Sequence, residues 1–462
     1  MHKLLIANRG EIACRIIRAA KKIGMPTVAV YSKADEAALH VQAADEAKFI
    51  GGPQARESYL NQDAVLQAAR ETGATLVHPG YGFLAENADF ARRCAEAGLV
   101  FVGPKPDTIS AMGDKHKARE IAVAAGVPVL PGSGKLSADA NEILAVGEKL
   151  GFPLLVKAAA GGGGIGMRLV EKAEDLVGAV TATSGLASRA FGDGAVYCER
   201  FVRTARHVEV QVFGFGDGRA VHLFDRDCSI QRRHQKVIEE ALAPGLPPAT
   251  RQEMARVSVA LAASCKYDGA GTIEFLYDQD RNEFYFLEMN TRIQVEHGVT
   301  ELITGVDLVR AQLEHGMGRD VSATLAQDSI RPDGWAVEGR VYAEDPARKF
   351  LPSPGKISHL SIPDLAGVRI DTGLASGSIV PPFYDPMVMK VMAHASTRSE
   401  AIRLLDAALA QIEIVGITTN KDYLRTTISH PEFVAGRLST GFLTVHNDSL
   451  AERAGSSRLA SA

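Results

Sequence analysis

The first hundred residues alternate short apolar runs with an amphipathic segment. Ile12, Ile16, Ala19 and Ile23 recur at helical spacing directly after a strand-like run. The apolar runs with the length of buried strands are residues 3–7, 27–31, 76–78 and 100–102. Strands and helices that alternate in this way predict a doubly wound parallel sheet over roughly residues 1–105.

Two turns follow strands of this predicted sheet. His78-Pro-Gly-Tyr-Gly-Phe83 would lie at the carboxyl end of a strand, where open α/β sheets bind ligands. A plain Gly/Pro turn explains the same residues equally well on local grounds. Asn8-Arg9-Gly10 lacks the later glycines of a dinucleotide-binding fingerprint and is weak support for NAD. This domain alone therefore predicts no function.

A glycine-rich loop follows the apolar strand of residues 152–157. Its glycines are Gly161, Gly162, Gly163, Gly164 and Gly166. Glycine lets backbone amides approach phosphate oxygens closely, and Lys157 and Lys115 can add positive charge. Gly-Lys-Ser/Thr is missing, so this is not a Walker loop. A flexible linker is the alternative, but strand-like segments on both sides favour a phosphate-binding loop.

Two polar segments lie further along the chain. His207, Glu209 and Gln211 alternate with valines, which predicts an ordinary half-buried strand. Residues 225–240 place cations beside acids, which suits either an anionic substrate or a solvated face. Neither segment decides the matter by itself.

A predicted β-hairpin provides the strongest chemical signal. The apolar runs 271–277 and 283–288 flank a polar turn. In the closed hairpin Glu274 and Glu288 would face and repel each other, with Asn290 on the same face. A hard divalent cation, most naturally Mg²⁺, would remove the repulsion. The alternative, a solvated hairpin face, is disfavoured by the crowding of charged and amide side chains that follow.

Composition narrows the class of protein. A chain of 462 residues is too long for one core, so roughly two to four domains are expected. The net charge of −4 is spread along the chain and gives no nucleic-acid footprint. The five cysteines are few and widely spaced, which predicts a reducing compartment. We find no signal peptide or membrane-spanning run and expect a cytoplasmic protein.

Four long motifs carry a resemblance to a known family: residues 3–13, 226–236, 288–297 and 384–387. With them the chain resembles biotin carboxylase, the ATP-grasp component of biotin-dependent carboxylases, up to about Asn447. The resemblance implies an α/β architecture of three domains. These are an N-terminal doubly wound (pre-ATP-grasp) domain at 1–112, an ATP-grasp domain at 113–330 with a mobile glycine-rich lid at about 132–203, and a C-terminal α+β biotin carboxylase domain at 331–447. Residues 448–462 are expected to form a disordered tail.

The resemblance also implies which residues bind each substrate. ATP contacts are implied for Lys115, Lys157, Gly161, Gly162, Gly163, Gly164, Gly166, Glu199, Arg200, Phe201, Val202, His207, Gln231, His234, Glu274 and Glu288. Ligands of Mg²⁺ (or Mn²⁺) are implied for Glu274, Glu288 and Asn290. Bicarbonate contacts are implied for Lys236, Arg292, Gln294 and the Val295 backbone. The implied catalytic set is Arg292, Glu296, Lys236 and Arg340.

Within that set, Glu296 is implied to be the general base that deprotonates bicarbonate, and Arg340 to bind biotin and stabilise the enolate of its ureido ring. A planar arginine fork can hold bicarbonate in two hydrogen bonds, which suits Arg292. Glu296 beside Arg292 and Lys236 is expected to stay ionised, because nearby cations favour a carboxylate.

The implied reaction is the Mg-ATP-dependent carboxylation of biotin by bicarbonate through carboxyphosphate. It would be the first half-reaction of a multisubunit acyl-CoA carboxylase of the acetyl-CoA type, which serves fatty acid biosynthesis. The implied partners are a biotin carboxyl carrier protein, a carboxyltransferase subunit and a second copy of the chain. Some motifs look closer to urea-type carboxylases, so a urea or amide carboxylase is an alternative. Two further alternatives are another ATP-grasp ligase and a non-catalytic ATP-binding regulator.

Several positions depart from the family pattern. Ile165 stands where Arg or Lys is common, Ala160 where glycine is common, and Gly298 and Leu242 where proline is frequent. These departures put the rigidity of the lid in question, but not the chemistry. The residues around Lys390 superficially resemble a biotinylation motif. A carrier lysine needs a separate domain with an exposed hairpin tip, so we expect Lys390 to be unmodified.

Overall fold

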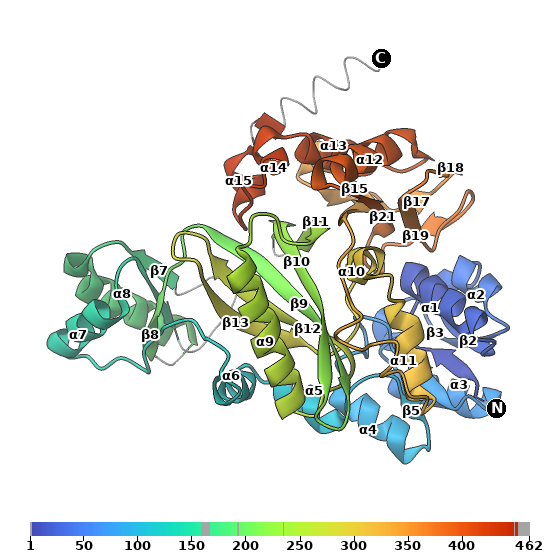
Figure 1. Ribbon diagram of the computed structural model, residues 1–462, viewed down its shortest axis with the longest axis horizontal. Helices are drawn as coiled ribbons and strands as arrows, with labels where there is room; N and C mark the ends of the chain where they lie inside the picture. Colours follow the sequence, from blue (N-terminus) through green and yellow to red (C-terminus); the bar gives the residue numbers. More distant parts are fainter. Residues whose placement is uncertain (1, 159–166, 192–193, 234, 448, 451–462) are drawn as a thin grey trace. The chain divides into compact units, whose positions relative to one another are not determined.

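The computed structural model describes residues 2–158, 167–191, 194–233, 235–447 and 449–450. The predicted glycine loop, with Ala160 and Ile165, lies outside the described residues, as do His234, Asp448 and residues 451–462. The chain forms two compact units (Figure 1). The first contains residues 1–127, 206–275 and 287–462, and the second contains residues 128–205 and 276–286. No helix within the described residues is long and apolar enough to cross a membrane.

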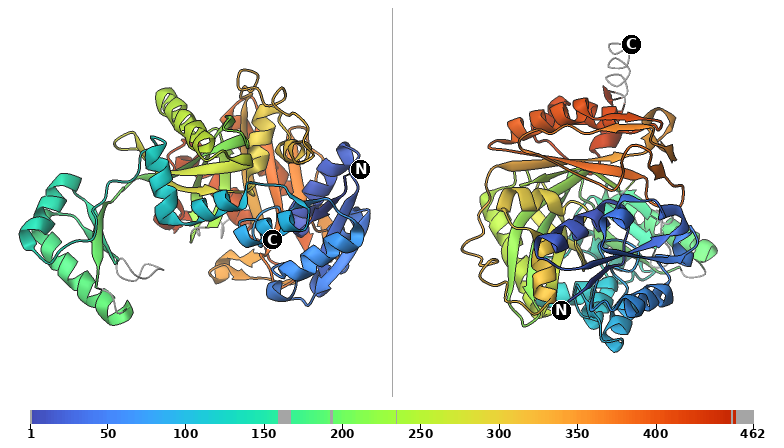
Figure 2. Two further views of the ribbon diagram at one scale, coloured as in Figure 1. Left: turned by 90° about the horizontal axis from the view of Figure 1, so that it is seen from below. Right: turned by 90° about the vertical axis from the view of Figure 1, so that its right-hand side faces the viewer.

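The predicted parallel sheet is confirmed at the start of the first unit. Its strands, in spatial order, are β3 (Glu46–Gly51), β2 (Thr27–Ser32), β1 (Leu4–Ile6), β4 (Leu76–His78) and β5 (Val100–Phe101), and all are parallel. Successive side chains of β1 enter different cores: Leu4 and Ile6 pack with helix α1 (Gly10–Lys22), and Leu5 packs with helices on the other face. Both faces are therefore covered, as Figure 2 shows.

The other helices and turns of this part of the chain are η1 (Lys33–Asp35), α2 (Leu39–Ala43), η2 (Ala55–Glu57), α3 (Gln62–Thr72), α4 (Ala88–Glu96), α5 (Pro106–Gly113) and α6 (Lys115–Ala124). Asp114 caps α6, since its carboxylate accepts from the backbone N–H groups of His116 and Lys117 at 2.9 and 3.1 Å. This cap fixes the start of α6, and with it the position of Lys115.

An eight-stranded sheet belongs mostly to the first unit, but its hairpin residues 276–286 belong to the second. Its order is β13 (Glu283–Asn290), β12 (Asp268–Asp278), β9 (Ala205–Phe215), β10 (Ala220–Arg232), β11 (Gln235–Ala241), β14 (Trp335–Tyr342), β21 (Met387–Ala395) and β19 (Val368–Thr372). Helix α9 (Pro248–Ser264) packs against β10 (Figure 1), and α10 (His297–Thr304) and α11 (Leu308–Gly316) follow the hairpin of β12 and β13. The predicted hairpin is thus confirmed.

The C-terminal part of this sheet carries its own apolar core. Helix α12 (Arg398–Gln411) packs Ala401, Leu405 and Leu409 onto β14 and β21. The remaining elements are β15 (Glu344–Asp345), η3 (Pro346–Arg348), β16 (Leu351–Pro352), β17 (Gly355–Lys356), β18 (His359–Ser361), β20 (Ile379–Val380), β22 (Glu413–Val415), α13 (Lys421–Ile428), α14 (Pro431–Val434) and α15 (Phe442–Val445). Leu450 is fully buried in the same core, so the predicted tail does not begin at Asp448.

The second unit contains a small antiparallel sheet and two helices. The strands are β7 (Met167–Val170), β6 (Leu154–Ala158) and β8 (Val196–Arg200), and the helices are α7 (Ala140–Leu150) and α8 (Ala173–Phe191). Strands β6 and β7 flank the glycine-rich segment, as the sequence predicts.

The structure corrects one expectation about the polar segments and excludes one of two alternatives for the other segment. Strand β9 is buried on both faces rather than half-buried, because its polar side chains pair with side chains of other elements, as Glu209 does with Arg226 and Lys236. Residues 225–240 form the hairpin of β10 and β11, whose described acidic and basic side chains are mostly buried. The solvated-face interpretation of that segment is therefore excluded.

Candidate active site

Lys236 on β11 is the centre of a buried charge cluster. Its Nζ donates to Glu209 Oε2 at 2.6 Å, to Glu274 Oε1 at 2.9 Å and to Glu296 Oε1 at 2.6 Å. Glu209 comes from β9, Glu274 from β12 and Glu296 from the N-cap of α10. One ammonium group thus joins three carboxylates from three elements. The sequence indicated a role for each of these residues except Glu209.

A second buried cation lies behind this cluster. Arg226 is fully buried and donates five hydrogen bonds. The acceptors are Glu209 Oε1 at 2.6 Å, Gln211 Oε1 at 2.8 Å, Thr300 Oγ1 at 2.9 Å, Thr272 Oγ1 at 3.1 Å and Gln294 Oε1 at 2.7 Å. Because its oxygen faces Arg226, the Gln294 amide turns its Nε2 to Glu274 Oε1 at 2.8 Å. Arg226 therefore orients Gln294, a function that no local pattern predicted.

The predicted metal ligands lie together on the hairpin. Asn290 Nδ2 donates to Glu274 Oε1 at 2.9 Å. Partial burial and the charge of Glu274 raise the pKa of Glu288, although Lys115 acts in the opposite direction. Burial opposes ionisation of Glu274, but Lys236 and His207 hold its pKa well below the ordinary value. Two carboxylates whose charges repel, next to an amide, are a donor set that suits a hard divalent cation.

His207 lies beside this donor set. Its Nε2 is 2.9 Å from Glu274 Oε2. Burial alone would lower the pKa of the imidazole, but the negative charge of Glu274 raises it. His207, Glu209 and Glu274 also have the spacing of a metal cluster. Lys236 already neutralises both carboxylates of this cluster, Glu209 and Glu274. In the set of Glu274, Glu288 and Asn290 it contacts only Glu274, so that set fits a metal better.

Arg340 lies among three buried carboxylates. Its Nη2 is 2.5 Å from Glu239 Oε1 and 3.0 Å from Glu296 Oε2, and its Nε is 4.0 Å from Glu338 Oε1. Glu239 and Glu338 are directly opposite each other in the pairing of β11 with β14. Burial raises the pKa of Glu239 to about 7 and that of Glu338 well above its usual range. Neither acid was expected from the sequence.

The surroundings of Glu296 favour its ionised form. Burial would raise its pKa, but Lys236, Arg340 and Arg226 together hold it well below the ordinary value. This lowered pKa agrees with the expected ionised carboxylate, and the role of Glu296 as a base stays a prediction. Arg340 and Arg226 add to the effect of Lys236 on Glu296. Arg292 also interacts electrostatically with Glu296, as expected, while it donates to Glu86 Oε2 and Asn290 Oδ1, both at 2.9 Å.

A cavity of about 550 Å³ opens beside this cluster. Arg292, Val295 and Arg340 contribute to its wall. The rest of the wall is Asn8, Arg9, Gly10, Glu11, Ile12, Tyr81, Gly82, Phe83, Tyr342, Phe383, Tyr384, Asp385 and Met387. The turn after β4 therefore does reach a potential ligand site, and the turn after β1 contributes to the same wall.

The predicted ATP contacts are divided between the two units. Lys157 and Glu199 form an ion pair within the second unit, where Arg200 N donates to Pro131 O at 2.9 Å and Phe201 N to Pro153 O at 3.0 Å, and Val202 is buried. Lys115 is exposed in the first unit, and Gln231 pairs with Lys236 across β10 and β11. The glycines of the loop and His234 lie outside the described residues.

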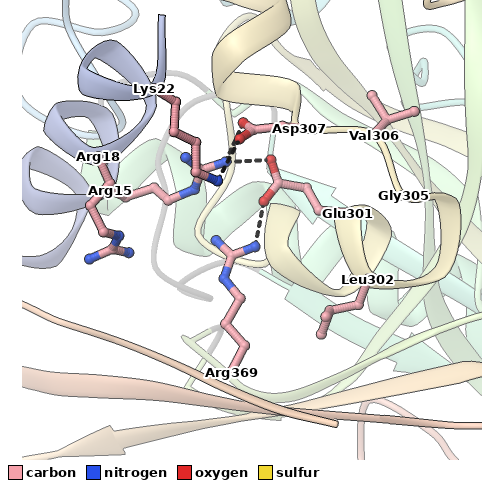
Figure 3. A pocket seen from close by; sticks show the side chains of 9 residues that line it. All are labelled: Arg15, Arg18, Lys22, Glu301, Leu302, Gly305, Val306, Asp307 and Arg369. Atoms are coloured by element: carbon pink, nitrogen blue, oxygen red, sulfur yellow. Dashed lines mark hydrogen bonds and ion pairs between the residues drawn. The ribbon is translucent and has the colours of Figure 1, made fainter.

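A separate charge cluster ties α1 to α10 and β19 (Figure 3). Arg15 Nη2 is 2.8 Å from Glu301 Oε1 and 2.5 Å from Asp307 Oδ1, and Arg369 Nη1 is 2.6 Å from Glu301 Oε2. Glu301 also accepts from the Leu308 N–H at 2.7 Å. These contacts anchor α10, whose N-cap carries Glu296.

Three protein-family models match successive parts of the chain. Residues 1–109 match the family model "Biotin carboxylase, N-terminal domain". Residues 114–324 match "Carbamoyl-phosphate synthase L chain, ATP binding domain", and residues 338–445 match "Biotin carboxylase C-terminal domain". The three models together match most of the chain.

Individual relatives agree with these matches. The chain is 49% identical over 444 residues to a biotin carboxylase of Halalkalibacterium halodurans, covering 96% of this chain and 97% of the relative. It is 48% identical over 450 residues to the mitochondrial methylcrotonoyl-CoA carboxylase subunit alpha of Mus musculus, covering 97% of this chain and 62% of that one. A solved dimer of the biotin carboxylase domain of Hydrogenobacter thermophilus 2-oxoglutarate carboxylase, in complex with MgADP, ADP and bicarbonate, is 41% identical. It superposes with a TM-score of 0.84 over 97% of this chain and 98% of that one. The chain belongs to the biotin carboxylase family.

Proposed function

We propose that this chain carboxylates biotin carried on a separate protein, using bicarbonate and Mg-ATP, with the Lys236 cluster as its catalytic centre. Membership of the family makes the chain an ATP-dependent ligase. The observation that carries the assignment of residues is the contact of Glu296 with Lys236 and Arg340 beside a cavity of about 550 Å³. The cluster offers an ionised base and fixed cations in one place.

The proposed ATP contacts fall into two groups of residues. Lys157 and the segment Glu199–Val202 belong to the second unit, and Lys115, His207, Gln231, Glu274 and Glu288 belong to the first. Phosphoryl transfer depends mainly on positioning and on neutralising phosphate charge, so lysines and backbone amides are suitable groups. Glu274, Glu288 and Asn290 would hold Mg²⁺, which supplies further neutralisation of the phosphates when bound.

Bicarbonate would bind where Lys236, Arg292, Gln294 and the Val295 backbone converge. Glu296 would take the bicarbonate proton, because its carboxylate is kept ionised by Lys236 and Arg340. The deprotonated anion would attack the γ-phosphate, the bond between the γ- and β-phosphates would break, and ADP would leave as carboxyphosphate forms. Arg292 would have to share its guanidinium between Glu86 and bicarbonate, since Glu86 accepts from its Nε at 2.9 Å.

Biotin would enter the same cavity next to Arg340. Carboxyphosphate would yield CO₂ and phosphate, the phosphate would take the ureido proton, and biotin N1′ would attack CO₂. A guanidinium stays charged at any physiological pH, so Arg340 can stabilise the enolate of the ureido ring. The ion pairs of Arg340 with Glu239 and Glu296 hold its guanidinium in the cavity wall.

The finer assignments rest on relatives. The match to a biotin carboxylase supports a biotin carrier protein and a carboxyltransferase as partners, and the dimeric neighbour supports a homodimer. We propose an acyl-CoA acceptor of the acetyl-CoA type, although the relatives include carboxylases of methylcrotonoyl-CoA and 2-oxoglutarate. The domain limits 1–112, 113–330 and 331–447 are supported by the family matches. Five free cysteines suit a reducing compartment, which supports a cytoplasmic location.

The test is an ADP-release assay with free biotin, run with and without bicarbonate. ADP release should require both biotin and bicarbonate, and a surface variant such as Glu253→Gln on α9 should match the wild type. ADP release that is independent of bicarbonate would refute the proposed function. Reconstitution with candidate carrier and transferase subunits, followed by assay of acetyl-CoA and urea, separates the acyl-CoA acceptor from the urea-type alternative.

A further inference from the structure

Two consecutive backbone carbonyls next to Glu296 are held from behind by buried nitrogen atoms. Gln294 O is 2.7 Å from His297 Nδ1, and Val295 O accepts from Lys390 Nζ at 2.6 Å. His297 and Lys390 are both fully buried. In a trans peptide the C=O and the following N–H point in opposite directions. Fixing these carbonyls therefore fixes where the N–H groups of Val295 and Glu296 point.

The contact between Gln294 O and His297 Nδ1 shows which ring nitrogen of His297 carries the proton. A carbonyl oxygen only accepts, so the proton of His297 resides on Nδ1. Burial first, and then the charges of Lys390, Arg15 and Arg369, hold the pKa of His297 well below its ordinary value. The ring is thus a neutral donor, locked to the backbone two residues before Glu296.

The second contact links distant parts of the chain. Lys390 lies on β21, opposite Arg340 on β14. Its ammonium is 3.4 Å from Glu11 Oε1, and Glu11 accepts a hydrogen bond from the Tyr81 hydroxyl. Glu11 and Tyr81 line the cavity that Val295 and Arg340 also line. The contact with Val295 O is shorter than the contact with Glu11, so Lys390 does more than balance a buried carboxylate.

We propose that His297 and Lys390 are positioning residues that fix the two peptide planes between Gln294 and Glu296. In this arrangement the Val295 N–H faces the bicarbonate position and the Glu296 carboxylate meets Lys236 and Arg340. The inference rests on the proposed function, since it assigns bicarbonate to the Val295 backbone. It also gives Lys390 a role other than carrying biotin.

The test compares variants that remove or retain each donor. His297→Leu removes the donor, whereas His297→Asn keeps an amide N–H near the position of Nδ1. Lys390→Met keeps the length of the side chain without the ammonium. Lys356→Met, at an exposed lysine of β17, is the control for loss of a lysine. The KM values for bicarbonate and for ATP are measured separately, and binding of MgADP is followed by thermal shift.

We expect His297→Leu and Lys390→Met to raise the KM for bicarbonate about tenfold and to leave the KM for ATP within about twofold, because one hydrogen bond of the bicarbonate segment is lost. His297→Asn should stay close to the wild type. An unchanged KM for bicarbonate in both variants would overturn the inference, as would equal losses of bicarbonate and MgADP binding that His297→Asn does not rescue. Wild-type enzyme without bicarbonate-dependent ADP release would instead refute the proposed function.

Discussion

Replacement of Glu296 by glutamine tests the assignment of the base most directly. Glu296 accepts from Lys236 through Oε1 at 2.6 Å and from Arg340 through Oε2 at 3.0 Å. Glutamine keeps the size of the side chain but accepts through one oxygen only, so its amide nitrogen must face one of the two cations. Lys236 retains Glu209 and Glu274 as partners, and Arg340 retains Glu239. The local fold should therefore survive while the proton acceptor is lost.

The expected loss follows from the role of a general base. Such a group contributes about 10²–10⁴-fold to the rate, or roughly 2.7–5.4 kcal/mol of transition-state stabilisation. Bicarbonate-dependent ADP release by Glu296→Gln should fall by this factor. MgADP affinity, measured by calorimetry, should stay within about threefold, because Glu274 and Glu288 are unchanged. ADP release within threefold of the wild type would remove Glu296 from the mechanism.

Three further predictions concern stability and the metal. Arg226→Met should lower the free energy of unfolding by about 3–5 kcal/mol, because it leaves buried Glu209 without its arginine, whereas exposed Arg256→Met should change it by under about 0.5 kcal/mol in the same urea titration. The raised pKa of Glu239, about 7 against an ordinary 4.5, contributes stability that is complete below about pH 4.5 and lost as the pH rises through 7. Glu239→Gln should therefore lose less stability than the wild type between pH 5 and 8, and parallel curves would contradict this. Glu288→Gln should abolish the extra thermal stabilisation that Mg²⁺ gives the ADP complex but keep that of ADP alone; an undiminished effect of Mg²⁺ would remove Glu288 from the metal site.

Local sequence patterns predicted those structural features that depend on neighbours in the chain. The period of two across β12 and β13 was enough to place Glu274, Glu288 and Asn290 on one hairpin. The parallel sheet followed from alternating apolar runs, because burial on both faces makes such strands apolar throughout. These features depend on spacing along the chain, and the sequence states that spacing directly.

Patterns failed where the decisive neighbour lies on a remote strand. Glu209 was interpreted as one polar residue of a half-buried strand, yet it is fully buried between Arg226 and Lys236. The sequence did contain a signal for the burial of Glu209, because its strand has a polar face and other segments rich in charged residues follow it. Arg292 interacts with Glu296 as expected, but no local pattern predicted that Glu86, which is 206 residues away in the chain, also accepts from its guanidinium.

The sequence by itself determined the architecture of the N-terminal sheet and the hairpin, because periodicity is a local property, and its motifs indicated most of the candidate site residues. Only the tertiary structure decided how these side chains are neutralised. The register of β11 with β14 places Glu239 opposite Glu338, and the pairing of β14 with β21 brings Lys390 to Val295, which is 95 residues away in the chain. The charge state of a buried group depends on such remote neighbours, since burial removes the water that would otherwise screen it.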